Sequence, residues 1–326
     1  MRRRGFIFGS AALASVRAAA GETPGTVPII GFLALPARVP PSEPYFTAFD
    51  QGLKESGFVA GDSVKIEYRF ANNRPEQLPT LAAELVQSGA SLITTPSGLP
   101  CIMAAKQASP ILPVIAILGS DAIEAGLIKS LNRPGGNVTG VIAPSAQIVE
   151  KQLELARELV TGMGKVGVLI EANYSQGPIL KAVRVAGARL NLNLVTAVVA
   201  NETELAQGFD TLTNAHIQCV VVPWTPLLVT RHEQITQFAM SNMLPDIYAP
   251  ADVLARGGLM SYGGSFPGIW RQLGVLTAKV LAGAKPAELP VEFPARIELR
   301  INLKTAKSLG LTIPPTLLAR ADEVVE

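Results

Sequence analysis

The chain has 326 residues, of which 48% are hydrophobic and 17% are charged, and its formal net charge is +2 at pH 7. A chain of this length exceeds the usual size of a single hydrophobic core, which favours two domains. It has no basic stripe with interleaved aromatic residues to hold phosphate backbones, so nucleic acid is not an expected partner.

The N-terminus has the three parts of a signal peptide. Arg2, Arg3 and Arg4 precede a small and apolar run at 8–14, and Ala18 to Ala20 supply an A-x-A cleavage site. We expect residues 1–20 to be removed near Ala20, which leaves a slightly acidic mature chain. The paired arginines also fit the twin-arginine route, and the Sec route stays open.

Neither cysteine lies near this cleavage site, so we expect a soluble periplasmic protein rather than a lipid-anchored one. Cys101 and Cys219 each fall in an apolar segment of a different half of the chain. We expect two separate buried thiols, because a disulfide between moving lobes would obstruct their closure.

From Val27 onward, short apolar runs alternate with amphipathic stretches, which is typical of βαβ units in a parallel sheet. In the first half the expected strands are 29–35, 64–70, 91–95 and 113–118, and the expected helices cover 45–53, 78–86 and 99–108. The turn-rich segment 131–141 follows, where we place the first passage between lobes.

A second series repeats this architecture. Its expected strands are 166–170, 194–199 and 219–222, and its helices are 147–160, 178–190 and 202–215. The glycine-bounded strand at 257–264 and the helix after it are expected to return to the first lobe. The tail from Arg296 then crosses a third time and ends with a short helix at 303–309.

The fold class expected is therefore α/β, with two similar parallel-sheet lobes joined by a three-segment hinge. One lobe comprises residues 27–142 plus 258–295, and the other comprises 143–257 plus 296–326.

Five segments carry a resemblance to a known family. They read QGLKESGFVAG (51–61), LNRPGGNVTGV (131–141), GLMSYG (258–263), KPAELPV (285–291) and INLKTAK (301–307). In this order they resemble the ABC-transporter substrate-binding family that includes tryptophan-binding receptors of Gram-positive bacteria. The resemblance implies a periplasmic-binding-protein fold of type 1, a small-molecule ligand in the cleft between lobes, a permease in the inner membrane and a monomeric state.

Ligands of open parallel sheets bind beyond the carboxyl ends of the strands. The strand-end loops that this rule selects supply the candidate ligand-binding residues, which are Ser97, Gly98, Ser120 and Asp121 in the first half and Asn173, Tyr174, Ser175, Trp224, Tyr248, Asp252 and Tyr262 in the second.

These candidates have alternative roles. Ser97 and Ser120 suit a ligand carboxylate, or they cap their own helices. Asp121 or Asp252 suits an ammonium group, or serves as a cap or a solvated carboxylate. Trp224 and Tyr248 could each cover a ring, or pack in the core.

Four further candidates have less specific expected roles. Tyr262 is expected in the hinge or the cleft floor, and residues 173–175 offer polar contacts. Because the chain departs from relatives around 223–228 and 248–255, tryptophan specificity is not carried over.

The sequence offers little catalytic machinery. Both histidines, His216 and His232, fall in or beside expected helices, where we expect surface positions. No G-x-S-x-G elbow or Walker lysine motif occurs, and the G-x-G-x-x-G at 162–167 follows a helix and opens a strand, which is the wrong context for a dinucleotide. No cofactor and no metal are expected.

The expected function is that of an extracytoplasmic receptor of an ABC importer, which captures an uncharged or zwitterionic solute by hinge closure. Two alternatives stay open: an exported sensory module, and an exported enzyme with Asp121 or Asp252 as its base.

Overall fold

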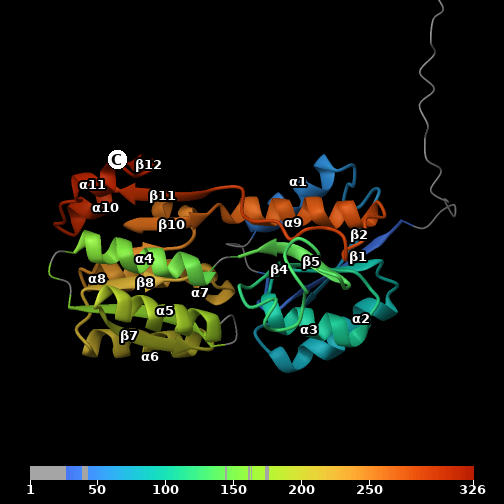
Figure 1. Cartoon of the computed structure of the whole chain (residues 1–326), viewed down its shortest axis with the longest axis horizontal. Coiled ribbons are helices and arrows are strands. Elements are labelled where there is room, and N and C mark those ends of the chain that lie inside the picture. Colours follow the sequence, from blue (N-terminus) through green and yellow to red (C-terminus); the bar gives the residue numbers. More distant parts are fainter. Residues whose placement is uncertain (1–26, 39–42, 144, 161, 163, 173–175) are drawn as a thin grey trace, which may run out of the picture.

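The computed structural model describes residues 27–38, 43–143, 145–160, 162, 164–172 and 176–326, and it has two lobes, each built on its own sheet (Figure 1). The first sheet is entirely parallel and has the order β2-β1-β3-β4-β5. Its strands are β1 (Ile29–Ala34), β2 (Lys65–Phe70), β3 (Leu92–Thr95), β4 (Val114–Leu118) and β5 (Val138–Ile142).

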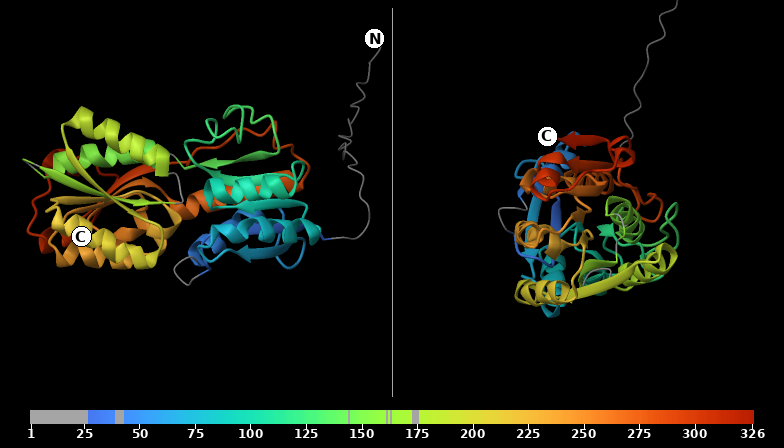
Figure 2. Two further views of the ribbon diagram at one scale, coloured as in Figure 1. Left: turned by 90° about the horizontal axis from the view of Figure 1, so that it is seen from below. Right: turned by 90° about the vertical axis from the view of Figure 1, so that its left-hand side faces the viewer.

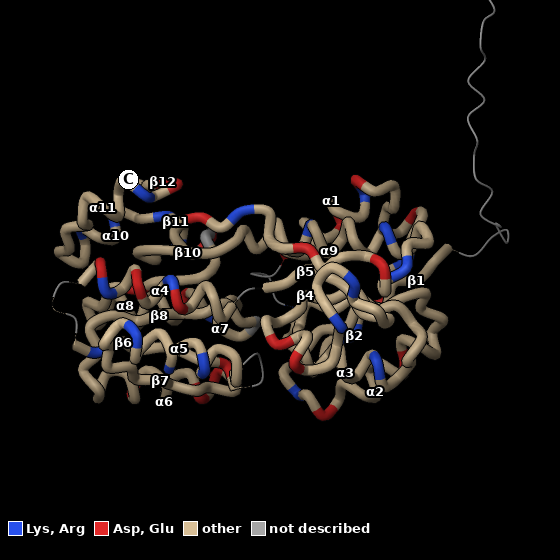
Figure 3. Tube along the Cα trace, in the orientation of Figure 1, with Lys and Arg blue, Asp and Glu red and all other residues tan. Residues whose placement is uncertain are grey.

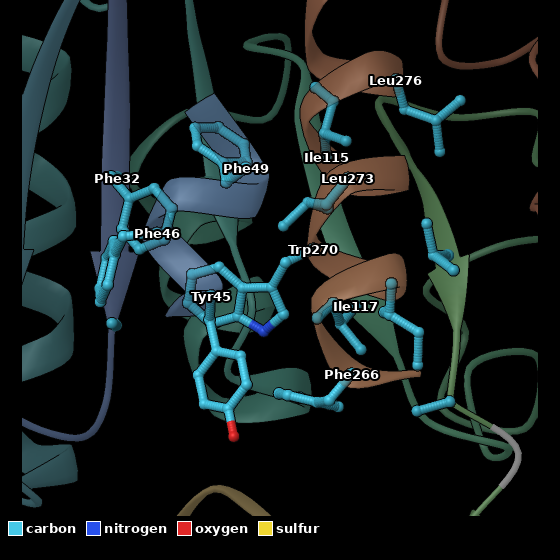
Figure 4. Packing of buried hydrophobic residues seen from close by; sticks show 14 of the residues in the cluster. Phe32, Tyr45, Phe46, Phe49, Ile115, Ile117, Phe266, Trp270, Leu273 and Leu276 are labelled. Carbon is cyan, nitrogen blue, oxygen red and sulfur yellow. The ribbon is translucent and has the colours of Figure 1, made fainter. Parts of the chain in front are cut away.

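Helices cover both faces of this sheet. On one face lie α2 (Leu78–Gln87) and α3 (Gly98–Ala108), with the short η2 (Pro75–Gln77) leading into α2. The other face is covered by α1 (Glu43–Glu55) and by α9 (Phe266–Leu281), which arrives from the far end of the chain. The core on this second face is rich in aromatic rings, as Figure 4 shows.

The second sheet has the order β12-β11-β10-β9-β8-β6-β7, in which only the β10–β11 pair is antiparallel. Its strands are β6 (Lys165–Glu171), β7 (Asn193–Val199), β8 (Cys219–Val222), β9 (Asp246–Tyr248), β10 (Met260–Gly264), β11 (Ile297–Asn302) and β12 (Glu323–Val325).

This sheet is also covered on both faces. The helices on one face are α4 (Ser145–Leu159), α5 (Gln176–Leu190), α10 (Leu303–Ser308) and α11 (Pro315–Leu318). Those on the other face are α6 (Glu202–Asn214), α7 (Pro226–Thr230), α8 (His232–Ser241) and η3 (Ala251–Arg256).

Each lobe contains the same doubly wound arrangement. In both, the first strand of the lobe lies between the second and the third, and the fourth and fifth follow in order. The predicted α/β class with two similar, mostly parallel sheets is confirmed. Since the carboxyl ends of parallel strands share one edge of a sheet, each lobe has a single edge suited to binding.

One boundary predicted from the sequence is wrong. The strand at 257–264 was expected in the first lobe, but β10 pairs with β9 and β11 in the second sheet. The chain returns to the first lobe only after Gly264, when α9 packs along α1. Flanking glycines mark the ends of a strand and carry no information on which sheet it joins, since that depends on tertiary pairing.

The chain therefore passes between the lobes in three places. These lie between β5 and α4, between β10 and α9, and in the segment before β11. In Figure 2 (left), the orange α9 begins where the two lobes meet, at the second of these crossings, and runs into the first lobe. Tyr262 on β10 packs against the cores of both lobes, which agrees with the expected hinge position.

Both cysteines are free and buried, as predicted. Cys101 lies in α3 and Cys219 in β8, one in each lobe. Burial raises the pKa of the Cys101 thiol to about 12, because the thiolate would lose its hydration. The thiol is therefore protonated at neutral pH.

Charged residues of both signs alternate over both lobes (Figure 3). Many of them pair on the surface, for example Arg69 with Glu84 and Arg320 with Glu158. Within the described residues, no helix combines the length and the apolar character needed to cross a membrane.

Candidate ligand-binding site

The strand ends of the two lobes face one another across an apolar pocket, called here the aromatic pocket. The space in it that no atom occupies, its open mouth included, is about 470 Å³. It is lined from the first lobe and α9 by Ala34, Pro36, Ala37, Tyr45, Phe46, Phe70, Pro96, Ser97, Phe266 and Trp270, and from the second lobe by Trp224, Val229 and Thr230.

Aromatic rings in mutual contact form nearly half of the wall. The Tyr45 ring meets the Phe266 ring edge-on, with centroids 4.9 Å apart, and Phe46 meets Trp270 in the same way at 5.1 Å. Figure 4 shows these four side chains together, with the Tyr45 hydroxyl pointing away from the core. Such edge-to-face contacts hold the rings in defined positions, so the wall is rigid before a ligand arrives.

Local sequence explains where these rings lie. Tyr45 and Phe46 stand in the first turn of α1, directly after the loop that follows β1. Phe266 and Trp270 are four residues apart and share a face of α9, whose start is capped by the Ser265 hydroxyl accepting from Gly268 N. The sequence analysis placed Tyr45 and Phe46 in the expected helix at 45–53 and did not identify them as site residues. It did not single out Phe266 or Trp270 either. Aromatic residues in the first turn after a strand-end loop are the signal that could have found them.

One hydrogen bond joins the lobes beside this pocket. The Tyr45 hydroxyl, from α1, donates to Asp252 Oδ2, from η3, over 3.0 Å. The other oxygen of Asp252, Oδ1, is buried and has no hydrogen-bond partner among the described residues. Desolvation and this neighbouring carboxylate raise the pKa of Tyr45, so the phenol stays protonated and able to donate.

Ser97 and Gly98 lie where the sequence placed them, at the start of α3. Ser97 is 1% exposed and lines the pocket, but its side chain does not cap α3. Its Oγ instead accepts from Leu35 N over 3.1 Å, which ties the end of β1 to the end of β3. Gly98 has φ +67°, a left-handed conformation that favours glycine, and this lets the helix begin directly after Ser97.

Ser120 and Asp121 do not reach the aromatic pocket. They line a separate, open groove together with Glu124, Glu150 and Lys181, between the first lobe and helices α4 and α5. Ser120 Oγ is buried and has no hydrogen-bond partner among the described residues. The loop after β4 thus lines this open groove, whereas the loop after β3 lines the aromatic pocket.

Tyr248 is a correction. It was considered for a ring-covering role, but its side chain is 1% exposed and belongs to the core of the second lobe. Its hydroxyl donates to Asp246 Oδ2 over 2.8 Å. Successive residues of β9 point to opposite faces of the sheet, and at this register Tyr248 points into the core beneath α6, α8 and η3. Tyr248 does not line the aromatic pocket.

Of the remaining candidates, Trp224 lies in the pocket wall, where it is 7% exposed. Its ring centroid is 4.4 Å from that of Phe266, across the boundary between the lobes. Asn173, Tyr174 and Ser175 lie outside the described residues.

Glu171 holds the second-lobe side of the pocket in place. It ends β6, is buried, and accepts from Leu227 N over 2.9 Å. This bond fixes the start of α7, whose Val229 and Thr230 line the pocket. Burial raises the pKa of Glu171 to about 7, although its hydrogen bonds from Thr225 and Leu227 act in the opposite direction.

The histidines are not part of the pocket. His216 is exposed, as expected, but His232 is 4% exposed, so its predicted surface position is wrong. Its Nδ1 contacts the carbonyl of Val229, because the turn between α7 and α8 folds the ring inward. Among the described residues, no cluster of three or more His, Cys, Asp or Glu side chains is arranged to hold a metal ion.

The arrangement is suited to binding an aromatic or apolar group. A family model described as "ABC transporter substrate binding protein" matches residues 40–325 of the chain. The chain is 28% identical, over 264 residues, to the tyrosine-binding protein of Clostridioides difficile (strain R20291), with 81% of this chain and 75% of that protein aligned.

Solved structures show the same fold. A Streptococcus pneumonia ABC domain in complex with L-Trp has a TM-score of 0.80 at 26% identity, and the match covers 92% of this chain and all of that one. A conserved domain protein from Vibrio cholerae has a TM-score of 0.81 at 22% identity with the same coverage. The ligand-free, open structure of a Clostridium difficile substrate-binding protein has a TM-score of 0.63 at 24% identity, covering 92% of this chain and 99% of that one.

Proposed function

This chain belongs to the ABC transporter substrate-binding protein family, and from that membership we propose that it is the extracytoplasmic solute receptor of an ABC importer. The ligand is an amino acid or a small aromatic compound, uncharged or zwitterionic. The receptor works in the periplasm as a monomer, without catalysis, and delivers its ligand to a permease in the inner membrane.

The observation that carries this proposal is the aromatic pocket itself. Its wall takes residues from both lobes, which three chain crossings connect, so a bound ring would contact both lobes at once. A ligand that contacts both lobes stabilises the closed form over the open one. Among the described residues, no Lys, Arg or His is part of the pocket lining, and the guanidinium of Arg38 lies over the Phe46 ring at 4.4 Å from its centroid.

Polar groups at the pocket edge suit a zwitterion. Backbone N–H groups at the start of α3, beside Ser97, can donate to a carboxylate. Asp252 is not part of the pocket lining but accepts from the pocket residue Tyr45, and its buried Oδ1, unpaired among the described residues, can accept from an ammonium group. The tyrosine-binding and L-Trp-bound relatives support an aromatic amino acid as the first ligand to test.

The arrangement of the lobes is similar to that of a ligand-bound relative, with a TM-score of 0.80 to the L-Trp complex at 26% identity. The Tyr45–Asp252 hydrogen bond joins the lobes in this arrangement. These observations support hinge closure as the mechanism of capture.

Thermal unfolding of the mature protein, residues 21–326, tests the proposal. L-Tyrosine or L-tryptophan at about 100 times its Kd should add about 2.7 kcal/mol to the free energy of unfolding and raise Tm by several degrees. Glucose is the negative control. If the folded protein responds to none of the aromatic amino acids or aromatic acids, or if it turns the ligand over, the proposal is wrong.

Tyr45→Phe is expected to weaken ligand binding about tenfold. The substitution keeps the ring and removes only the hydroxyl that donates to Asp252, a hydrogen bond to a charged group worth about 1.5 kcal/mol in favour of the closed form. Calorimetric titration with the ligand found above measures it. Tyr68→Phe is the matched control, because Tyr68 packs on Phe46 inside the first lobe. Equal affinities of Tyr45→Phe and wild type would contradict a closing role for this bond.

A further inference from the structure

We propose that Trp224 is a specificity-determining residue that limits the length of the bound ligand. The inference rests on the proposed receptor function and concerns the same cleft. The Trp224 indole separates the aromatic pocket from a second apolar pocket at the hinge, so the wild-type cleft accepts a ligand of one ring system and rejects one extended by a further ring.

The second pocket, called here the hinge pocket, has about 310 Å³ of space that no atom occupies, its opening to solvent included. All three chain crossings contribute to its wall. Ala143 and Ser145 come from the first crossing, Gly264 and Phe266 from the second, and Pro294 from the third. Its other lining residues are also mostly apolar, Ile148 and Ile269 among them.

Two residues line both pockets, and they are Trp224 and Phe266. Their rings are in contact, with centroids 4.4 Å apart and planes inclined by 34°. Trp224 reaches this contact from the second lobe, at the loop between β8 and α7, and Phe266 reaches it from the start of α9. The pair therefore forms a partition across the cleft.

The two halves of the partition are not equivalent. Phe266 is held on the first-lobe side by its edge-on contact with Tyr45 and lies beside Trp270 on the same helix. Trp224 supplies the larger ring, and its removal leaves Phe266 and the first-lobe wall in place. Deleting the indole would therefore join the aromatic pocket and the hinge pocket into one elongated apolar cleft.

This partition has a predictable effect on specificity. A rigid apolar wall discriminates between ligands by the clash that a longer one would create. A ligand with a second ring in line with the first would have to displace a nearly buried indole from its contact with Phe266. We therefore expect the natural ligand to be an aromatic compound of one ring system, and the wild-type cleft to reject a two-ring extension.

Calorimetric titration with L-tyrosine and with 4-phenyl-L-phenylalanine, which keeps the amino-acid group and adds a ring, provides the test. Wild type should bind L-tyrosine and bind the longer compound at least tenfold more weakly. Trp224→Ala should bind the longer compound at least tenfold more tightly than wild type does. Ile148→Ala is the matched control, because it enlarges the hinge pocket and leaves the partition intact. Its affinities for both compounds should equal those of wild type.

A second pair of probes separates this inference from the proposed function. Phenol and 4-phenylphenol lack the amino-acid group, so their effect on Tm depends on pocket length alone. The Tm of Trp224→Ala should rise more with 4-phenylphenol than with phenol, and the Tm of wild type should not. This result is expected even if no amino acid binds. Circular dichroism establishes that the variant is folded. Three outcomes would overturn the inference. The first is a folded Trp224→Ala whose Tm rises no more with 4-phenylphenol than with phenol, and the second is an equal rise in Ile148→Ala. The third is a wild type that binds the longer probes as well as the shorter ones.

Discussion

Gly274→Ala is expected to lower the free energy of unfolding by about 3 kcal/mol, the upper end of what overpacking usually costs. A Cβ at this position would lie well under 3.0 Å from the backbone carbonyl oxygen of Phe49 on α1. Because that neighbour is backbone, the helices must move apart. Alanine favours a helix over glycine by about 1 kcal/mol, so a net loss of stability would show that the clash exceeds this gain.

The close approach of α1 and α9 is reciprocal. Gly52 on α1 meets the carbonyl of Arg271 on α9 in the same way. These two helices also carry four aromatic residues of the pocket wall, which are Tyr45, Phe46, Phe266 and Trp270. Separating the helices should therefore also weaken ligand binding.

Chemical denaturation followed by circular dichroism measures the effect of Gly274→Ala. Gly177→Ala is the matched control, since Gly177 also lies in a helix, α5, and a Cβ there meets no atom within 4 Å. We expect the control to equal or slightly exceed wild type in stability. A Gly274→Ala protein as stable as the control would show that α1 and α9 can separate at little cost.

The second large effect is on pH dependence: the free energy of unfolding should fall as the pH rises from about 4.5 to about 7. Burial raises the pKa of Glu171 from 4.5 and that of Asp246 from 3.8, each to about 7. In this range the folded state holds protons that the unfolded state has released. Each carboxyl therefore costs the folded state about 1.4 kcal/mol per pH unit until its folded pKa is reached.

Carboxyls with a lowered pKa make the free energy of unfolding rise with pH, but only at pH values below about 4.5. Arg and Lys partners lower the pKa of Glu67 and Glu154, so their contribution to stability is lost as the pH falls below about 4.5. Burial also raises the pKa of Asp50, so this carboxyl adds to a decline between pH 4.5 and 7 that is assigned mainly to Glu171 and Asp246.

Asp246→Asn and Glu171→Gln test this assignment, because an amide mimics the protonated carboxyl. Asp246 accepts from Leu259 N at Oδ1 and from the Tyr248 hydroxyl at Oδ2, each over 2.8 Å. Asparagine can accept from Leu259 N with its oxygen and donate its amide N–H to the Tyr248 hydroxyl oxygen, as the protonated carboxyl would. Urea denaturation at a series of pH values should show that each variant gains stability relative to wild type as the pH rises. A constant difference between pH 4.5 and 8 would refute the raised pKa of the substituted residue.

Much of the fold is encoded locally. The alternation of apolar runs with amphipathic stretches predicted most strands and helices of both lobes, because strand and helix periods depend on near neighbours alone. It did not predict β5, β9, β11, α7 or α8. The two buried thiols and the placement of Ser97, Gly98 and Trp224 at strand ends followed from the same reading. Which sheet β10 joins depends on its pairing with β9 and β11, and nothing within residues 257–264 specifies that choice.

What the sequence determined by itself was the class of fold, the repetition of one architecture and the edge of each sheet at which a ligand would bind. Tertiary structure decided which side chains meet at that edge. Tyr248 and Trp224 both follow strands of the second lobe, yet one is packed into the core and the other reaches Phe266 in the opposite lobe. Phe266 stands on a later helix in the other lobe, and the core around Tyr248 is built from several separate elements, so only the assembled lobes decide which of the two side chains faces the cleft.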